Sequence, residues 1–124
     1  MTASEEAHVE TWLITGGAGF IGCNFVRLVL RETEAHVVIL DKLTYAGNLD
    51  NLGDVLADPR VTFIAGDIVD PAAVLAIFRD HRPTAVLNFA AESHVDRSID
   101  GPRNFVITNT VGAFELLDAS RRFV

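Results

Sequence analysis

Short apolar runs alternate with longer amphipathic stretches along most of this chain. Four runs that end in glycine or polar residues predict buried strands at 12–15, 37–40, 61–65 and 85–89. Apolar residues spaced three and four apart predict helices over 20–33, from Pro71 to Arg82, and from Pro102 onward. The crossovers between strands are long enough for parallel pairing, so we expect an α/β fold with a parallel sheet.

Each predicted helix has apolar positions that we expect to face the core. Those of the first helix are Ile21, Phe25, Leu28 and Val29. The second helix has Asp70 as its N-cap and Pro71 in its first turn. It is expected to bury Ala73, Val74, Ile77 and Phe78. The last helix carries Phe105, Val106, Val111, Phe114 and Leu117. The polar segment 44–58 holds one weak helical stretch near 49–56.

Composition limits the classes of protein to which this chain can belong. Its 124 residues, 49% of them apolar, suffice for one domain with a core, and no apolar run reaches the roughly 18 residues of a membrane span. Scattered acidic residues give a net charge of −7, which argues against binding to nucleic acid or anionic membranes. Cys23 is the only cysteine and the first ten residues do not resemble a secretory signal, so we expect a cytoplasmic protein.

The strongest local motif is a glycine-rich segment between the first predicted strand and helix. It contains Gly16-x-x-Gly19-x-x-Gly22 and also Gly17-x-Gly19-x-x-Gly22. Glycines permit a tight turn and the close approach of backbone to a pyrophosphate, which the N-terminus of the helix attracts. A turn that is merely rich in glycine is the alternative, which the strand before and the helix after disfavour.

An acidic residue closes the second predicted strand. Asp41 follows Gly22 by 19 residues, near the spacing expected of the carboxylate that binds the adenosine ribose 2′-OH. A carboxylate there would repel a 2′-phosphate, so it favours NAD over NADP. The neighbouring Lys42 weakens this discrimination because it could meet a phosphate, and a solvated acid at a strand end is the alternative interpretation.

Other candidate residues follow the third and fourth strands. Asp67, after Gly66, could reach an adenine edge, although an ordinary loop acid is an equally good interpretation. Ser93 and His94 suggest a nucleophile and base, but neighbours in sequence seldom point at each other. Packing is the better interpretation for Cys23. The remaining histidines have no metal-ligand spacing and we predict no metal site: His8, His36 and His81.

Four segments together resemble the N-terminal part of the dTDP-glucose 4,6-dehydratases, a family of extended short-chain dehydrogenase/reductase proteins. These segments are 14–22 (ITGGAGFIG), 40–52 (LDKLTYAGNLDNL), 66–68 (GDI) and 90–99 (AAESHVDRSI). The resemblance implies an α/β Rossmann-type doubly wound parallel sheet, here incomplete, with about four strands in the order 3-2-1-4. It implies NAD as cofactor, dTDP-glucose as the nucleotide-sugar substrate, and a homodimer for the full-length enzyme.

The same resemblance implies roles for individual residues. Phe20 and Ile21 would cover the pyrophosphate, and Asp67 and Ile68 would hold the adenine. Around the adenosine ribose would lie Asp41, Lys42, Leu43 and Thr44. The path toward the nicotinamide would be lined by Phe89, Ala90, Ala91, Ser93 and Thr108. Ser93 would also touch the sugar nucleotide, and Asn109 would support the active site.

The reaction of these enzymes is an internal redox dehydration that uses a Tyr-x-x-x-Lys pair and an Asp-Glu pair. The chain contains neither, because its only tyrosine, Tyr45, is followed four residues later by Leu49, and no Asp-Glu dipeptide occurs. We therefore expect residues 1–124 to form the N-terminal part of an NAD-binding domain, without the catalytic and sugar-binding parts and inactive alone. Its fourth strand would be an unpaired edge open to dimerisation or aggregation. Alternatives are another nucleotide-sugar epimerase or decarboxylase, or a non-catalytic nucleotide-binding fragment.

Overall fold

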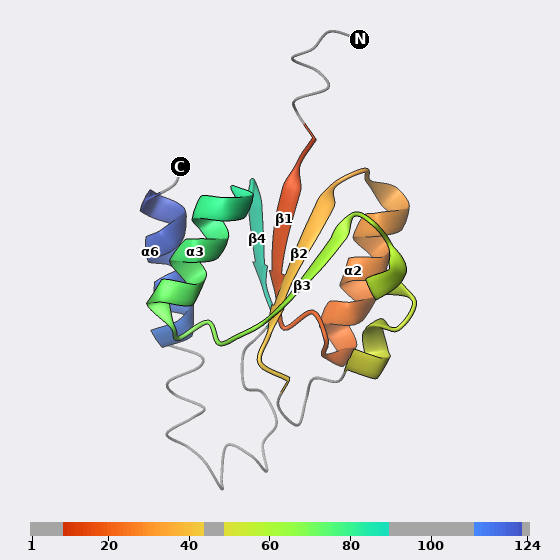
Figure 1. The fold of residues 1–124 in the computed structure, drawn as a ribbon, viewed down its shortest axis with the longest axis horizontal. Helices are drawn as coiled ribbons and strands as arrows, with labels where there is room; N and C mark the ends of the chain where they lie inside the picture. The colour runs from red at the N-terminus through yellow and green to blue at the C-terminus, as the bar shows by residue number, and fades with distance from the viewer. Residues whose placement is uncertain (1–8, 44–48, 90–110, 123–124) are drawn as a thin grey trace, which may run out of the picture.

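Four parallel strands form the centre of the molecule. The computed structural model describes residues 9–43, 49–89 and 111–122, and its sheet has the order β3-β2-β1-β4 (Figure 1). The strands are β1 (Thr11–Thr15), β2 (His36–Asp41), β3 (Val61–Ala65) and β4 (Ala85–Asn88). This confirms the predicted Rossmann-type sheet and its strand order, with ends that differ from the predicted ones by at most one residue.

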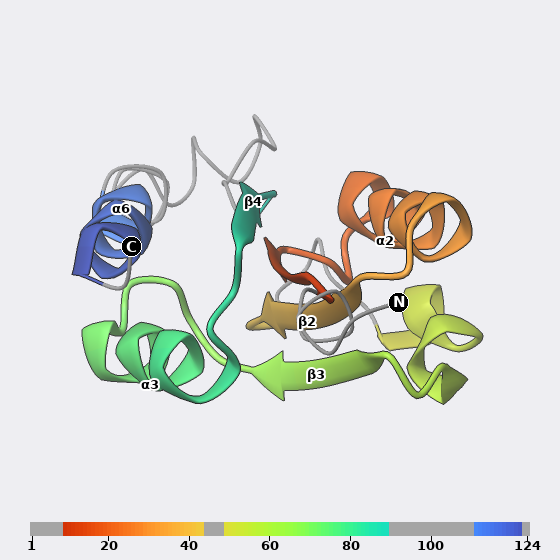
Figure 2. The same cartoon turned by 90° about the horizontal axis from the view of Figure 1, so that it is seen from above.

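Helices cover both faces of the sheet, as the view from above shows (Figure 2). One face is covered by α2 (Phe20–Glu32) with two short 3₁₀ helices, η1 (Leu49–Leu52) and η2 (Val55–Ala57). The other face is covered by α3 (Pro71–His81) and α6 (Ala113–Arg122). The weak helical stretch predicted near 49–56 is therefore two 3₁₀ helices, separated by Gly53 and Asp54.

The core has two halves because successive strand residues point to opposite faces of the sheet. Ile14 and Ile39 pack toward α2, whereas Leu13 and Leu40 pack toward α3 and α6. All four side chains are fully buried. The apolar runs of β1 and β2 are continuous in the sequence because both faces of these strands are covered.

The side of α2 that faces the sheet differs from the predicted one. Val29 is buried and Phe25 partly buried, as predicted, but Ile21 and Leu28 are exposed, so the prediction is wrong for these two. The buried positions are Gly22, Cys23, Val26 and Val29. Gly22 lies directly against the backbone of Gly16, and this close contact fixes the rotation of the helix about its axis.

The prediction for α3 is confirmed. The Asp70 carboxylate accepts hydrogen bonds from the backbone N–H groups of Ala72 and Ala73, at 3.1 and 3.3 Å, as an N-cap does. Arg82, in the left-handed region at φ 48°, ends the helix before Pro83. The side chains predicted to be buried are fully or partly so: Ala73, Val74, Ile77 and Phe78.

The buried side of α6 also differs from the predicted one. The described apolar side chains predicted for this helix, Val111, Phe114 and Leu117, are exposed, Phe114 by 60% and Leu117 by 71%. Leu116 and Ala119 are the buried positions. The reason is a close contact at the start of the helix, where a side chain on Gly112 would meet Ile68 at 2.3 Å. The start that was predicted at Pro102 lies outside the described residues.

The direction of the strands places all their carboxyl ends at one edge of the sheet, the lower edge in Figure 1. The segments after β1, β2 and β3 therefore meet there. Within the described residues, β4 pairs only with β1, so the long side of β4 that faces away from β1 has no strand partner there. No helix in the described ranges is long and apolar enough to span a membrane.

Candidate functional site

The glycine-rich segment forms a tight turn between β1 and α2. Gly16 has φ 71°, in the left-handed region that favours glycine. Its N–H donates to the Leu40 carbonyl at 2.8 Å, and its own carbonyl accepts from the Gly19 N–H at 3.1 Å. These bonds fix the turn to the end of β2 and close it upon itself.

Two further glycines are required by close packing. A Cβ atom on Gly22 would lie 2.2 Å from the Gly16 carbonyl oxygen, and one on Gly17 would lie 2.6 Å from the Ile39 Cγ2 atom. Any side chain at Gly22 would have to displace backbone atoms. The turn and the first helical residues thus pack directly on each other, which is what a Gly-rich phosphate-binding turn requires.

The turn ends at the N-terminus of α2, which has the features of an anion-binding site. Gly19 is the N-cap and supplies no side-chain cap, and the Cys23 N–H donates to the Gly19 carbonyl at 2.9 Å. The N–H groups of Phe20, Ile21 and Gly22 precede this bond and have no acceptor within the helix. Phe20 and Ile21 are 79% and 68% exposed, so both can cover a group bound there.

Asp41 joins this turn to the segment after β2. One carboxylate oxygen accepts from the Ala18 N–H at 2.9 Å and the other from the Leu43 N–H at 2.7 Å. Asp41 is only 8% exposed. Each oxygen has a second lone pair, so the carboxylate can hold the turn and still accept from a ribose hydroxyl.

Lys42 and Leu43 follow Asp41 at the same edge of the sheet. Leu43 has φ 57°, an uncommon value for a non-glycine residue, and its bond to Asp41 helps to hold it there. The Lys42 ammonium lies 3.7 Å from the Asp67 carboxylate, and both groups are about one-third exposed. The structure thus pairs two predicted cofactor residues that follow neighbouring strands.

Ile68 and Phe89 use their side chains for packing. Ile68 is buried in the core beside Leu116, which leaves only its backbone for contact with an adenine. The Phe89 ring lies 5.4 Å from the Phe25 ring, centroid to centroid. The Phe89 N–H continues the ladder from β4 by donating to the Thr15 carbonyl at 2.8 Å.

Several other candidate residues can now be placed. Cys23 is buried, and its thiol donates to the Phe20 carbonyl at 3.2 Å, consistent with a packing role. In the described ranges, no three histidine, cysteine, aspartate or glutamate side chains are grouped so as to hold a metal ion. The remaining predicted residues lie outside the described residues: Thr44, Ala90, Ala91, Ser93, His94, Thr108 and Asn109.

Two polar contacts near the carboxyl ends of the strands were not predicted from the sequence. The Thr15 hydroxyl donates to the Asn88 side-chain oxygen at 2.5 Å and joins the ends of β1 and β4. Asn51 of η1 donates from its amide to the Ala18 carbonyl at 2.8 Å. No local pattern identifies Asn51, because its partner lies 33 residues earlier in the chain.

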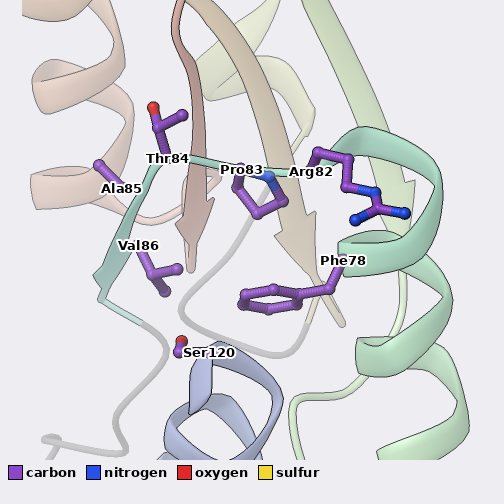
Figure 3. Close-up of a pocket in the computed structure, with 7 residues that line it drawn as sticks. All are labelled: Phe78, Arg82, Pro83, Thr84, Ala85, Val86 and Ser120. Atoms are coloured by element: carbon purple, nitrogen blue, oxygen red, sulfur yellow. The ribbon is translucent and has the colours of Figure 1, made fainter. Parts of the chain in front are cut away.

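A cavity of about 540 Å³ lies at the other end of β4, away from this edge (Figure 3). None of the predicted cofactor residues lines it. Its lining residues are Phe78, Arg82, Pro83, Thr84, Ala85, Val86 and Ser120.

The parallel sheet in this order, with its glycine turn at a helix N-terminus and an acid closing β2, defines a Rossmann-type dinucleotide-binding fold. The model of the GDP-mannose 4,6 dehydratase family matches residues 13–124, and the chain belongs to this family.

Curated relatives in this family are named dTDP-glucose 4,6-dehydratase. The one from Shigella flexneri is 53% identical over 111 residues, covering 90% of this chain and 31% of the relative. The one from Xanthomonas campestris pv. campestris (strain B100) is 55% identical over 115 residues, covering 93% and 32%. The chain therefore spans about a third of the length of the curated relatives it matches.

Solved structures of similar fold include two classes of nucleotide-sugar enzyme. The dTDP-glucose 4,6-dehydratase of Streptomyces venezuelae with NAD bound has a TM-score of 0.83 and 46% identity, covering 89% of this chain and 35% of that one. A UDP-glucose 4-epimerase of Thermotoga maritima has a TM-score of 0.81 and 32% identity, covering 91% and 34%. The fold is thus common to both classes, while sequence identity is higher to the dehydratase.

Proposed function

We propose that this chain binds NAD as the cofactor-binding part of a dTDP-glucose 4,6-dehydratase. The observation that carries the proposal is the turn from Gly16 to Gly22, in which close backbone packing and the start of α2 leave N–H groups for a pyrophosphate. Identity above 50% to curated dehydratases supports the substrate class. The epimerase alternative has weaker support, since the curated dehydratases are 53% and 55% identical and the epimerase structure is 32% identical.

In this proposal, different residues of the chain bind different parts of the cofactor. The N-terminus of α2 holds the pyrophosphate under Phe20 and Ile21, and Asp41 accepts from the adenosine ribose. The segment Gly66-Asp67-Ile68 meets the adenine, with Ile68 acting through its backbone. When bound, NAD supplies the group that takes a hydride from the sugar and returns it, while these residues bind and orient the dinucleotide.

We assign NAD and not NADP to the site. The Asp41 carboxylate is almost buried, and in this proposal it binds the adenosine ribose, so it would repel a 2′-phosphate. Lys42, a cation next to Asp41 in the chain that could meet a phosphate, is paired with Asp67 at 3.7 Å. This pairing supports the discrimination that Asp41 provides.

The catalytic and sugar-binding residues belong, in this proposal, to sequence beyond residues 1–124. The absence of Tyr-x-x-x-Lys and Asp-Glu pairs and the greater length of the relatives support this. The open edge of β4 offers the place for a further strand. We also propose a cytoplasmic homodimer for the complete enzyme, with the exposed apolar residues of α6 as one support for self-association.

The binding proposal is tested by calorimetry with the 124-residue chain, NAD and NADP. We expect NAD to bind weakly and NADP at least tenfold more weakly. No heat with NAD at millimolar concentration would refute the cofactor assignment for this chain.

The substrate proposal needs the natural gene product. We expect a protein about three times this length that converts dTDP-glucose to a 4-keto sugar, detected by its absorbance in alkali. A natural gene product of 124 residues that binds NAD but forms no keto sugar would show a nucleotide-binding protein and would refute the proposed dehydratase activity.

A further inference from the structure

We infer that Asn51 is a positioning residue that holds the glycine-rich turn in the conformation that binds a pyrophosphate. This inference rests on the proposed function, and it assigns a role to a residue outside the turn and outside the predicted site. Asn51 lies on η1, a part of the chain that the glycine motif does not include.

The backbone of Ala18 is the group that Asn51 holds. Ala18 is fully buried, and its carbonyl accepts from the Asn51 amide at 2.8 Å. On its other side, the Ala18 N–H donates to the Asp41 carboxylate at 2.9 Å. Side chains from two separate segments therefore bind both polar backbone groups of this one residue.

These bonds fix two successive peptide planes. The Ala18 carbonyl and the Gly19 N–H belong to one planar peptide unit, and this N–H donates to the Gly16 carbonyl at 3.1 Å. The preceding unit is fixed through the Ala18 N–H. Because Gly19 is the N-cap, the orientation of these units sets the direction in which the first N–H groups of α2 point. Without the Asn51 bond, only the Gly19–Gly16 bond would hold this peptide unit, and the glycines on either side would permit it a wider range of orientations.

Asn51 is itself held by α2. Its backbone carbonyl accepts from the Arg27 guanidinium, which also forms two bonds to the Asp54 carboxylate, at 2.8 and 3.2 Å. The turn, η1 and the helix that the turn begins are thus joined in one closed network. If Asn51 only attached η1 to the core, it would not need to bond to Ala18, the residue just before the N-cap of α2.

The test compares ligands with and without a pyrophosphate on the 124-residue chain. We expect Asn51→Ala to weaken ADP and NAD about five- to tenfold and to leave adenosine within about twofold, since one hydrogen bond and its orienting effect are lost. Asn51→Ser, which keeps a shorter donor, should fall between. Asn24→Ala is the matched control, because it removes an exposed carboxamide that bonds within α2 at 2.9 Å. It should leave ADP binding unchanged.

A lower melting temperature for Asn51→Ala with an unchanged ratio of ADP to adenosine affinity would show a merely structural role and overturn the inference. If the unsubstituted chain binds neither ADP nor NAD, the proposed function fails, and amide hydrogen exchange then decides on the positioning role. Faster exchange of the hydrogen-bonded Ala18 and Gly19 N–H groups in Asn51→Ala than in Asn24→Ala would support it, and equal exchange would overturn it.

Discussion

Replacing Gly22 with alanine tests how tightly the glycine turn packs on α2. Alanine favours a helix by about 1 kcal/mol over glycine, so helix propensity alone predicts a more stable protein. The structure predicts the opposite. The added Cβ would lie 2.2 Å from the Gly16 carbonyl oxygen and 3.0 Å from the Gly17 Cα atom, both backbone atoms that cannot rotate away.

The expected size of this effect comes from the displacement that the methyl group requires. An ordinary carbon–oxygen contact is about 3.3 Å, so the start of α2 would have to move by roughly 1 Å. A backbone displacement of this size puts the cost at the upper end of the usual range, about 3 kcal/mol, and subtracting about 1 kcal/mol of helix propensity leaves a net loss near 2 kcal/mol. For a chain of this size, that lowers the melting temperature by about 8 °C. We also expect NAD affinity to fall at least tenfold, because the pyrophosphate site moves with the helix.

Thermal unfolding can be followed by the fluorescence of Trp12, the only tryptophan, with NAD binding measured by calorimetry. Gly53→Ala is the matched control, because its Cβ would meet only the Asp50 carbonyl oxygen, at an ordinary 3.7 Å. It should be neutral or slightly stabilising. A Gly22→Ala protein as stable as the unsubstituted chain, with unchanged NAD affinity, would refute the packing argument.

Three further predictions concern the hydrogen bonds of Asp41, the ion pair between Arg27 and Asp54, and the buried side of α6. Asp41→Asn should cost about 1–3 kcal/mol, seen in urea unfolding, because an amide has one oxygen and cannot accept from the Ala18 and Leu43 N–H groups as the two carboxylate oxygens do. Since Arg27 lowers the pKa of Asp54 from 3.8 to about 2, their pair should stabilise the folded chain above about pH 4, and this should vanish as pH falls toward 2. The difference in urea midpoint between the unsubstituted chain and Asp54→Asn should shrink over this range. Leu116→Ala should cost about 2–5 kcal/mol and Leu117→Ala less than about 0.5.

Each of these predictions has a clear contrary result. Equal urea midpoints for Asp41→Asn and the unsubstituted chain would mean that its two bonds add nothing to stability. A midpoint difference for Asp54→Asn that stays constant between pH 6 and 2 would exclude the ion pair as its cause. Equal losses at positions 116 and 117 would contradict the rotation of α6 described above.

Much of the fold and part of the site were predictable because their signals are local. A run of apolar residues closed by glycine is enough to predict β1, and Asp70 before Pro71 is enough to predict the start of α3. The glycine motif could be placed at a helix N-terminus for the same reason. Asp41 was predictable from its spacing, since the distance along a βαβ unit fixes which residue closes the second strand.

The sequence pattern by itself thus determined the order of elements and the glycine turn, and the family resemblance supplied the strand order, whereas the tertiary structure decided which sides of the helices are buried. In α2 and α6, apolar residues occur on more than one side, so periodicity permits several rotations. Close contacts at Gly22 and Gly112 select one rotation each and leave Ile21 and Leu117 exposed. The bond from Asn51 to Ala18 was likewise beyond prediction, because it joins residues that only the folded chain brings together.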